Sequence, residues 1–158
     1  MKFEMLNDFV TSAKVDENGI RKYNGKIPAE LMDIWKEYGF GSFFGGYLKV
    51  INPDDYMDIV KDSYFRGNVS IPILGTVFGD IITWEENQYT GIVRYRYNDF
   101  DFLSTRFDLF LKLLSDKGFL KCFFALEEYA QAVEKYGELA YDECLVMSLF
   151  LHLEEKRM

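Results

Sequence analysis

The chain has 158 residues, of which 49% are apolar and 28% charged, a composition typical of one globular domain that buries a core without a metal or disulfide. Its 26 acidic residues outnumber 18 basic ones, and the net charge of −8 repels nucleic acid and anionic membranes, so we expect neither as a partner. The same composition excludes disordered, collagen-like and coiled-coil proteins. A membrane-spanning protein is excluded because the longest apolar run, residues 145–151, is far shorter than the roughly 20 residues of a spanning helix. Without a secretion signal at its start, the sequence predicts a soluble, cytoplasmic protein of a single domain, residues 1–158.

The first third of the chain predicts one well-defined helix. After an amphipathic stretch over residues 3–10 and a turn at residues 16–19, Ile27 and Pro28 open a helix, since proline in the first helical turn costs no hydrogen bond. Its apolar side chains recur at helical spacing on one face: Leu31, Ile34, Trp35 and Tyr38. Gly39 ends this helix in the left-handed conformation that glycine adopts readily.

A glycine-rich connection separates this helix from the next. Residues 39–46 lead into a strand at residues 47–51, and Asn52 and Pro53 then begin a helix as its N-cap and first helical residue. Three apolar residues of this helix are expected to point inward: Tyr56, Ile59 and Val60. Its outward face carries four carboxylates: Asp54, Asp55, Asp58 and Asp62.

Between residues 71 and 102 the apolar residues alternate, which predicts strands. Four are expected, at residues 71–78, 81–85 and 89–97 and around Phe100 and Phe102. Gly79 and Asp80 suit a two-residue hairpin turn, and short turns between sequential strands predict an antiparallel meander. Arg94 and Arg96 fall on one face of the third strand, where we expect them to pair with acidic residues of a neighbouring strand rather than to bind phosphate.

The last third of the chain is expected to be helical. Thr105 and Asp108 resemble a capping box, and Gly137 closes the second of two apolar stripes. The stripes are Phe107, Phe110, Leu111 and Leu114, then Leu126, Tyr129, Ala130, Val133 and Tyr136. Residues 144–151 are apolar almost all round, so we expect a helix that is deeply buried or covered by a second copy in a homodimer. Helices at both ends of a central antiparallel sheet make an α+β fold.

The sequence offers little chemistry for catalysis. His152, the one histidine, lies near the C-terminus, and Cys122 and Cys144 are widely separated and set among apolar residues, unlike zinc ligands. The stretch 39–46 follows a helix and precedes a strand, the reverse of a nucleotide-binding loop. Four carboxylate pairs leave metal-dependent chemistry as a weaker alternative: Asp54/Asp55, Glu85/Glu86, Asp99/Asp101 and Glu127/Glu128. We therefore expect no enzyme, cofactor or metal.

Protein binding is the more attractive interpretation. The helix bearing Asp54, Asp55, Asp58 and Asp62 would present an acidic face to a basic partner, although a solvated face that keeps the protein soluble explains the charge as well. Aromatic residues make up 18% of the chain, so some of them are available for contacts outside the core. Those beside loops would serve as interface anchors: Phe43, Phe44 and Trp84, with Glu85 next to it.

An ordered series of motifs resembles the GAD-like domain family. The motifs are Ile27-Pro28-Ala29-Glu30-Leu31, Trp35-Lys36-Glu37-Tyr38-Gly39-Phe40-Gly41, Gly46-Tyr47-Leu48, Asn52-Pro53-Asp54-Asp55-Tyr56 and Thr76 to Glu85. From Phe110 through Tyr136-Gly137-Glu138-Leu139 to Asp142-Glu143-Cys144, the chain is similar to the companion domain at the end of type VI secretion DNase immunity proteins. The resemblance divides the chain into a GAD-like part, residues 27–103, and a helical C-terminal part, residues 104–158. Residues 145–158 depart from the pattern, because they lack its proline and its glycine pair.

This resemblance implies a bacterial immunity protein without catalytic activity that binds and neutralises a cognate toxin, a secreted nuclease effector. A nuclease domain that is basic would complement the acidity of this chain. The positions that match the family most directly are Tyr38, Gly39, Gly79, Asp80, Trp84 and Glu85, most of which the residue patterns assign to turns, caps and core. The alternative function is a scaffold or regulatory module that binds another protein, with residues 144–151 as its contact.

Overall fold

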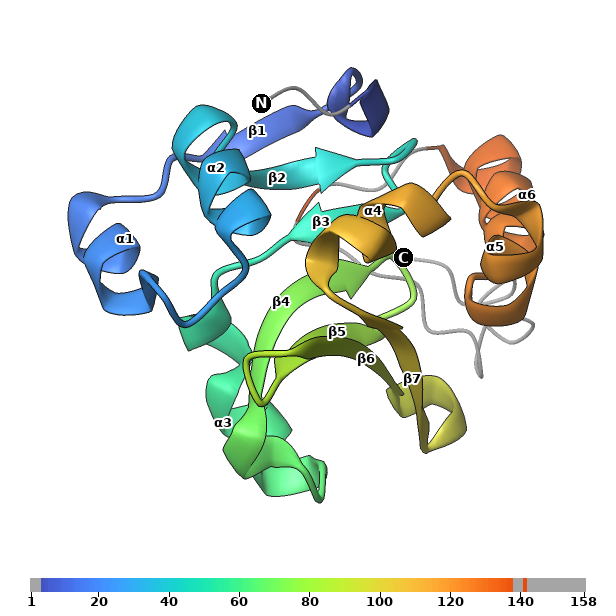
Figure 1. Cartoon of the computed structure of the whole chain (residues 1–158). Coiled ribbons are helices and arrows are strands. Elements are labelled where there is room, and N and C mark those ends of the chain that lie inside the picture. Colours follow the sequence, from blue (N-terminus) through green and yellow to red (C-terminus); the bar gives the residue numbers. More distant parts are fainter. Residues whose placement is uncertain (1–3, 138–140, 142–158) are drawn as a thin grey trace.

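A computed structural model of the protein describes residues 4–137 and 141. Its centre is one antiparallel sheet in which each strand pairs with the next along the chain, so the predicted meander and α+β fold are confirmed (Figure 1). The strands are β1 (Val10–Ala13), β2 (Phe40–Phe43), β3 (Leu48–Val50), β4 (Ser70–Thr76), β5 (Ile81–Glu85), β6 (Tyr89–Arg94) and β7 (Asp99–Thr105). The helices are α1 (Glu17–Tyr23), α2 (Ala29–Glu37), α3 (Pro53–Ser63), α4 (Phe107–Leu113), α5 (Lys117–Phe123) and α6 (Leu126–Tyr136). Three short 3₁₀ helices are η1 (Glu4–Leu6), η2 (Gly67–Val69) and η3 (Tyr95–Tyr97).

The two faces of the sheet are buried by different helices. The main core joins the sheet to α2, α4, α5 and α6, and it is built on large apolar side chains such as Trp35 and Phe110. A smaller cluster lies under α3, where Val60 and Tyr64 pack with Ile81 and Val93. The apolar residues of β5 and β6 alternate between the clusters, as strand geometry requires.

The predicted ends of the helices are mostly found where expected. Asn52 caps α3 by accepting a hydrogen bond from the Asp54 N–H at 3.0 Å, with Pro53 as the first helical residue. Gly39 follows α2 with φ +82°, and a Cβ there would lie 2.4 Å from the Ala13 carbonyl oxygen, so glycine is required on two grounds. The helix α2 begins one residue later than predicted, with Pro28 as its N-cap.

Two helix starts were predicted wrongly. Residues 16–19 are not a free-standing turn, because the Asp16 carboxylate accepts the Gly19 N–H at 2.7 Å and caps α1. Thr105 forms no capping box, since Arg106 is the N-cap of α4 and no side chain caps that helix. The apolar stripe of α4 is nevertheless buried as predicted.

The strands also differ from the prediction in number and length. The glycine-rich segment contains a strand, β2, because Gly41 lets β1 approach so closely that a Cβ would lie 2.1 Å from the Val10 carbonyl oxygen. β4 ends at Thr76, and a four-residue loop replaces the predicted two-residue turn, held by the Thr76 hydroxyl, which accepts the Phe78 and Asp80 N–H groups. β6 ends at Arg94, where η3 begins.

The C-terminal part of the chain can be compared with the prediction only up to Gly137 and at Tyr141. The predicted stripe of α6 is confirmed at Tyr129 and at the partly buried Leu126, Val133 and Tyr136, which all pack on the main core. Ala130 is exposed, and Ala132 is buried instead. Residues 144–151 and His152 lie outside the described residues, and so does the predicted homodimer contact. No helix in the described ranges is both long and apolar enough to span a membrane.

Candidate protein-binding surface

Three large aromatic side chains point into solvent near one edge of the sheet. Phe65 is 72% exposed, Phe100 50% and Phe102 52%. The rings of Phe65 and Phe100 are 4.9 Å apart, and Phe100 and Phe102 alternate along β7, which places them on one face. We call Phe65, Phe100 and Phe102 the aromatic patch. A contiguous exposed apolar surface of this kind commonly marks a binding site.

The strand β7 lies at the end of the described sheet, so one of its edges has no neighbouring strand among residues 4–137. Its other face carries Asp99 and Asp101, which both form ion pairs with Arg94 of β6, at 2.7 and 3.4 Å. The cross-strand pairing predicted for Arg94 is therefore confirmed. The aromatic patch lies on the α3 side of the sheet, because Phe100 is paired with Val93 of the smaller core.

Two tyrosines pack against the rings of the aromatic patch. Tyr64 is buried, and its ring lies 5.4 Å from that of Phe65 and 5.7 Å from that of Phe100. Tyr89 of β6 lies 5.5 Å from Phe102. Both tyrosines belong to one polar network, so the exposed rings rest on side chains whose own positions are fixed by hydrogen bonds.

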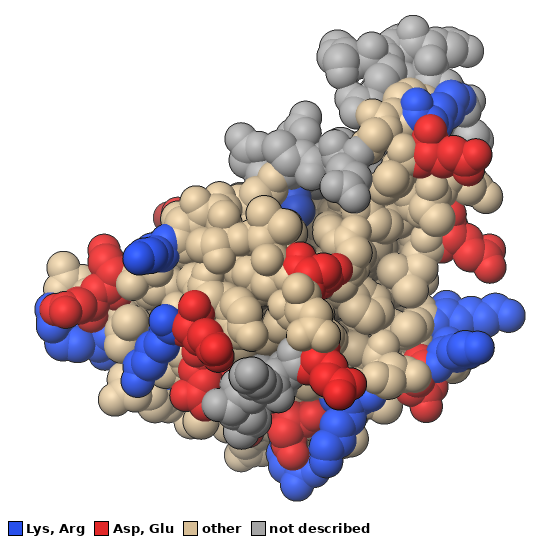
Figure 2. Space-filling model, turned by 90° about the horizontal axis from the view of Figure 1, so that it is seen from above, with Lys and Arg blue, Asp and Glu red and all other residues tan. Residues whose placement is uncertain are grey.

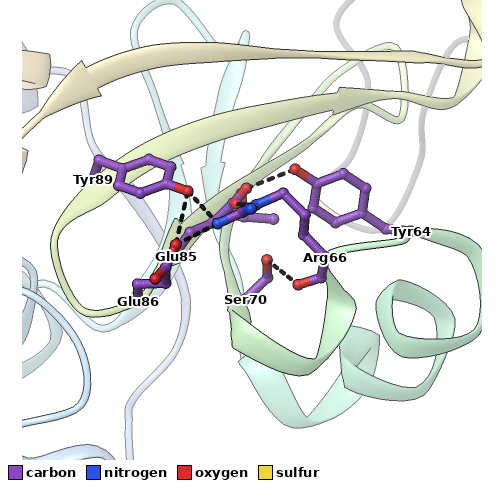
Figure 3. A network of polar contacts seen from close by, with 7 residues as sticks. Tyr64, Arg66, Ser70, Glu85, Glu86 and Tyr89 are labelled. Atoms are coloured by element: carbon purple, nitrogen blue, oxygen red, sulfur yellow. Dashed lines mark hydrogen bonds and ion pairs between the residues drawn. The ribbon is translucent and has the colours of Figure 1, made fainter.

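The centre of this network is the buried carboxylate of Glu85, which is 1% exposed. It accepts hydrogen bonds from the Tyr64 hydroxyl at 2.9 Å, Arg66 Nε at 2.7 Å and the Thr83 hydroxyl at 2.7 Å (Figure 3). A buried carboxylate is tolerated only when it is paired and hydrogen-bonded in this way. Gly91 of β6 leaves the necessary space, since a Cβ there would lie 2.6 Å from Glu85 Oε2.

Arg66 links the buried carboxylate to the surface. Its Nη2 donates to Glu86 at 2.5 Å and also to the Tyr89 hydroxyl, and its guanidinium lies 5.8 Å from the centre of the Tyr89 ring. Burial and the hydrogen bond to Glu85 raise the pKa of Tyr64 far above its ordinary value, so its hydroxyl stays protonated and donates at every physiological pH. The network is thus built to fix the segment that carries Phe65.

Comparison with known proteins places the chain in a family. The family model described as the GAD-like domain matches residues 2–95, which is more than half of the chain. The chain belongs to the GAD-like domain family. The matched range contains Phe65 and the whole polar network but ends before Phe100 and Phe102.

The chain is also similar to a solved structure, Atu4351 from Agrobacterium tumefaciens. The sequences are 22% identical, the TM-score is 0.54, and the match covers 60% of this chain and 47% of Atu4351. The present chain therefore matches less than half of that protein, and the likeness is one of fold. No curated protein matches the chain.

Three residues predicted to contact a partner are buried in the GAD-like fold. Phe43 and Trp84 are 1% and 6% exposed and belong to the main core, and Glu85 is the buried carboxylate described above. Their expected place on an interface is therefore wrong, because both faces of the sheet are covered: Phe43 and Trp84 face the main core, and Glu85 faces the α3 side, where Tyr64 binds it. Phe44 is half-buried against Phe124, with ring centres 6.3 Å apart, so only part of it faces solvent.

The four predicted aspartates of α3 are exposed, but they are not equivalent. Asp54 accepts hydrogen bonds from Lys22 Nζ at 2.7 Å and the Tyr23 hydroxyl at 2.5 Å, so it ties α3 to α1. The other three, Asp55, Asp58 and Asp62, form no ion pair with a described residue.

Of these three aspartates, Asp62 lies nearest the aromatic patch, whereas Asp55 lies in the first turn of α3 and lines a cleft with α1. The last turn of α3 is held beside η3 by a 2.8 Å hydrogen bond between the hydroxyls of Ser63 and Tyr95. Asp62 therefore lies close to Phe65, three residues further along the chain. Ile59, expected to point inward, is 54% exposed on this helix and adds to its outer surface. On the face seen from above, by contrast, acidic and basic side chains alternate around the rim (Figure 2).

Hydrogen bonds from Lys22 and Tyr23 hold the pKa of Asp54 below its ordinary value. We expect Lys22→Gln to raise this pKa, as measured by NMR titration of the Asp54 carboxyl. Because the folded-state pKa is lowered, the contact stabilises the protein above pH 4 or so and is lost as the pH falls through that pKa. Arg21→Gln on the same helix should leave the Asp54 pKa unchanged, and equal titration of wild type and Lys22→Gln would contradict the assignment.

Other predicted chemistry finds little support in the described residues. No group of three potential metal-ligating side chains comes together within residues 4–137 and 141. Cys122, expected to sit among apolar residues, is exposed. Arg96 does not share a strand face with Arg94 but lies in η3, where it pairs with the buried Asp80.

Proposed function

We propose that this GAD-like protein is a non-catalytic immunity protein of the bacterial cytoplasm, which binds and neutralises a cognate toxin, a secreted nuclease effector. The observation that carries the proposal is the aromatic patch, Phe65, Phe100 and Phe102, exposed on the rigid polar network around Glu85. Aromatic side chains dominate the binding energy of protein interfaces when they enter pockets of the partner. Side chains that are already ordered lose less entropy on binding.

The charge of α3, whose last turn precedes Phe65, suits a basic partner. Asp55, Asp58 and Asp62 are exposed on α3, and the chain as a whole has a net charge of −8. A nuclease needs a positively charged groove to bind nucleic acid, so acidic side chains would both steer it to this surface and occupy its substrate site. The resemblance of residues 110–144 to the C-terminal domain of DNase immunity proteins supports the same class of partner.

The proposal is tested by finding the partner and measuring what binding does to it. The tagged chain is expressed in the cells from which it comes, and proteins that co-purify are identified by mass spectrometry. We expect a larger protein whose C-terminal domain kills cells when expressed alone and is harmless when co-expressed with this chain. Recovery of the chain alone would contradict the proposal, and recovery of a housekeeping protein would favour a scaffold module instead.

A further inference from the structure

A cleft of about 710 Å³ lies on the opposite side of β7 from the aromatic patch. It is formed by η3 and the start of β7 on one side and by α5 and the first turn of α6 on the other. Its volume is in the range of small-molecule binding sites. None of the residues of the aromatic patch or of the Glu85 network lines it, so it is a separate site.

One residue that lines the cleft, Arg96, is a buried cation with hydrogen-bond donors that no described residue accepts. The Arg96 side chain is 4% exposed, and its only ion pair among the described residues joins Nη2 to Asp80 Oδ2 at 3.0 Å. Its Nε and Nη1 have no hydrogen-bond partner in the described part of the chain. The guanidinium lies over the rings of Phe78 and Tyr97, with its central carbon 4.7 Å from the centre of each ring.

The unused donors of Arg96 define what the cleft would bind. Arginine stays charged at any physiological pH and has no acceptor atom, so its free N–H groups can be satisfied only by an acceptor, preferably an anionic oxygen. Buried donors in folded proteins nearly always have a protein, water or ligand partner. Asp80 occupies only one donor of the guanidinium, since Nη2 binds Oδ2 and the Asp80 Oδ1 has no hydrogen-bond partner among described residues.

The rest of the cleft adds positive charge and apolar surface. Lys117 and Lys121 lie one turn apart on α5 and form no ion pair with a described residue. The apolar lining includes Leu120 and Phe123 from the same helix. Three acidic residues also line the cleft: Asp99, which pairs with Arg94, and Glu127 and Glu128 at the start of α6.

We propose that this cleft binds a small organic anion. Its carboxylate or phosphate group would accept hydrogen bonds from Arg96 Nε and Nη1 and face Lys117 and Lys121, while an apolar body packs on Leu120 and Phe123. The proposal stands apart from toxin binding, since it uses a different surface and needs no protein partner.

The test uses the purified full chain, with benzoate and phenyl phosphate as probes and benzyl alcohol as a neutral control of similar size. Calorimetry should give saturable one-to-one binding of at least one anion and none of the alcohol. In NMR spectra the Arg96 Nε–H resonance should shift during the titration. The anion that binds more tightly distinguishes a carboxylate site from a phosphate site.

Variants separate the cleft from general charge effects. We expect Arg96→Gln and Leu120→Trp, which fills the cleft, each to weaken binding at least tenfold, and Arg106→Gln, an exposed arginine outside the cleft, to bind as wild type. If Arg96→Gln fails to fold, Leu120→Trp still tests the proposal, because Leu120 is only partly buried and its replacement should leave the fold intact. Absence of anion binding, equal binding of benzyl alcohol, or full affinity in Leu120→Trp would each overturn the proposal.

Discussion

Removing the aromatic patch is expected to abolish toxin binding while leaving the fold intact. The variant Phe65→Ser/Phe100→Thr/Phe102→Thr deletes three rings that are at least half exposed, and threonine preserves the strand preference of β7. An aromatic hot-spot residue contributes about 2 kcal/mol or more to binding, so losing three should weaken affinity by about 10⁴-fold. Calorimetry with the toxin domain recovered from cells measures this effect directly.

A matched control keeps this result interpretable. Val10 is 66% exposed on β1, at the opposite end of the sheet from β7, so Val10→Thr removes exposed apolar surface without touching the patch. It should bind the toxin as wild type does. The free energy of unfolding in urea should change by less than about 1 kcal/mol in Val10→Thr, because an exposed side chain contributes little to stability. The triple variant should lose about 1–3 kcal/mol, because its rings also pack on Tyr64 and Tyr89, and it should still unfold cooperatively. A folded triple variant with unchanged affinity would show that the toxin binds elsewhere.

Charge reversal on α3 separates steering from contact. The variant Asp55→Lys/Asp58→Lys/Asp62→Lys should slow association most at low salt, because exposed charges act at a distance and are screened above about 0.1 M. Asp54 is left unchanged in this variant, since it binds Lys22 and Tyr23. Stopped-flow association rates of the wild type and the variant at two salt concentrations provide the measurement. A variant that associates as fast as the wild type at low salt would remove the acidic helix from the interface.

What the sequence could predict was local. Asn52-Pro53 and Gly39 act within a few residues of their own position, so their roles as caps follow from chain geometry alone. The alternation around Phe100 and Phe102 likewise predicts a strand correctly. The meander follows as well, because short connections bring sequential strands together.

What it could not predict depends on partners far away in the chain. Alternation says that Phe100 and Phe102 share a face, but only the order of the strands puts them at an edge that no described helix covers. Phe43 and Trp84 were expected outside because they adjoin loops, but both belong to the main core, which includes residues of helices distant in the sequence. Glu85 looks like half of an acidic surface pair, and its burial becomes visible only when Tyr64 and Arg66 are brought against it.

The largest effect on stability is expected at Glu85. Glu85→Ala leaves Arg66, Tyr64 and Thr83 without their common acceptor, and removing one partner of a buried ion pair costs 3–5 kcal/mol in general. Arg66 is 30% exposed, so water can compensate part of its loss, and we expect a cost of about 3 kcal/mol. The midpoint of urea unfolding measures this loss.

Neighbouring substitutions distinguish burial from charge. Glu86→Ala removes the half-exposed carboxylate that binds the same arginine and should cost about 1 kcal/mol or less, as surface ion pairs do. Glu85→Gln keeps an oxygen that can accept from Tyr64 and Thr83, so its cost should fall between the two. If Glu85→Ala were no more destabilising than Glu86→Ala, the network would not be what holds Tyr64 and Phe65 in place. By contrast, a folded Glu85→Gln protein with weakened toxin binding would connect the polar network to the aromatic patch, because this variant keeps all three exposed rings and changes only the hydrogen bonds beneath them.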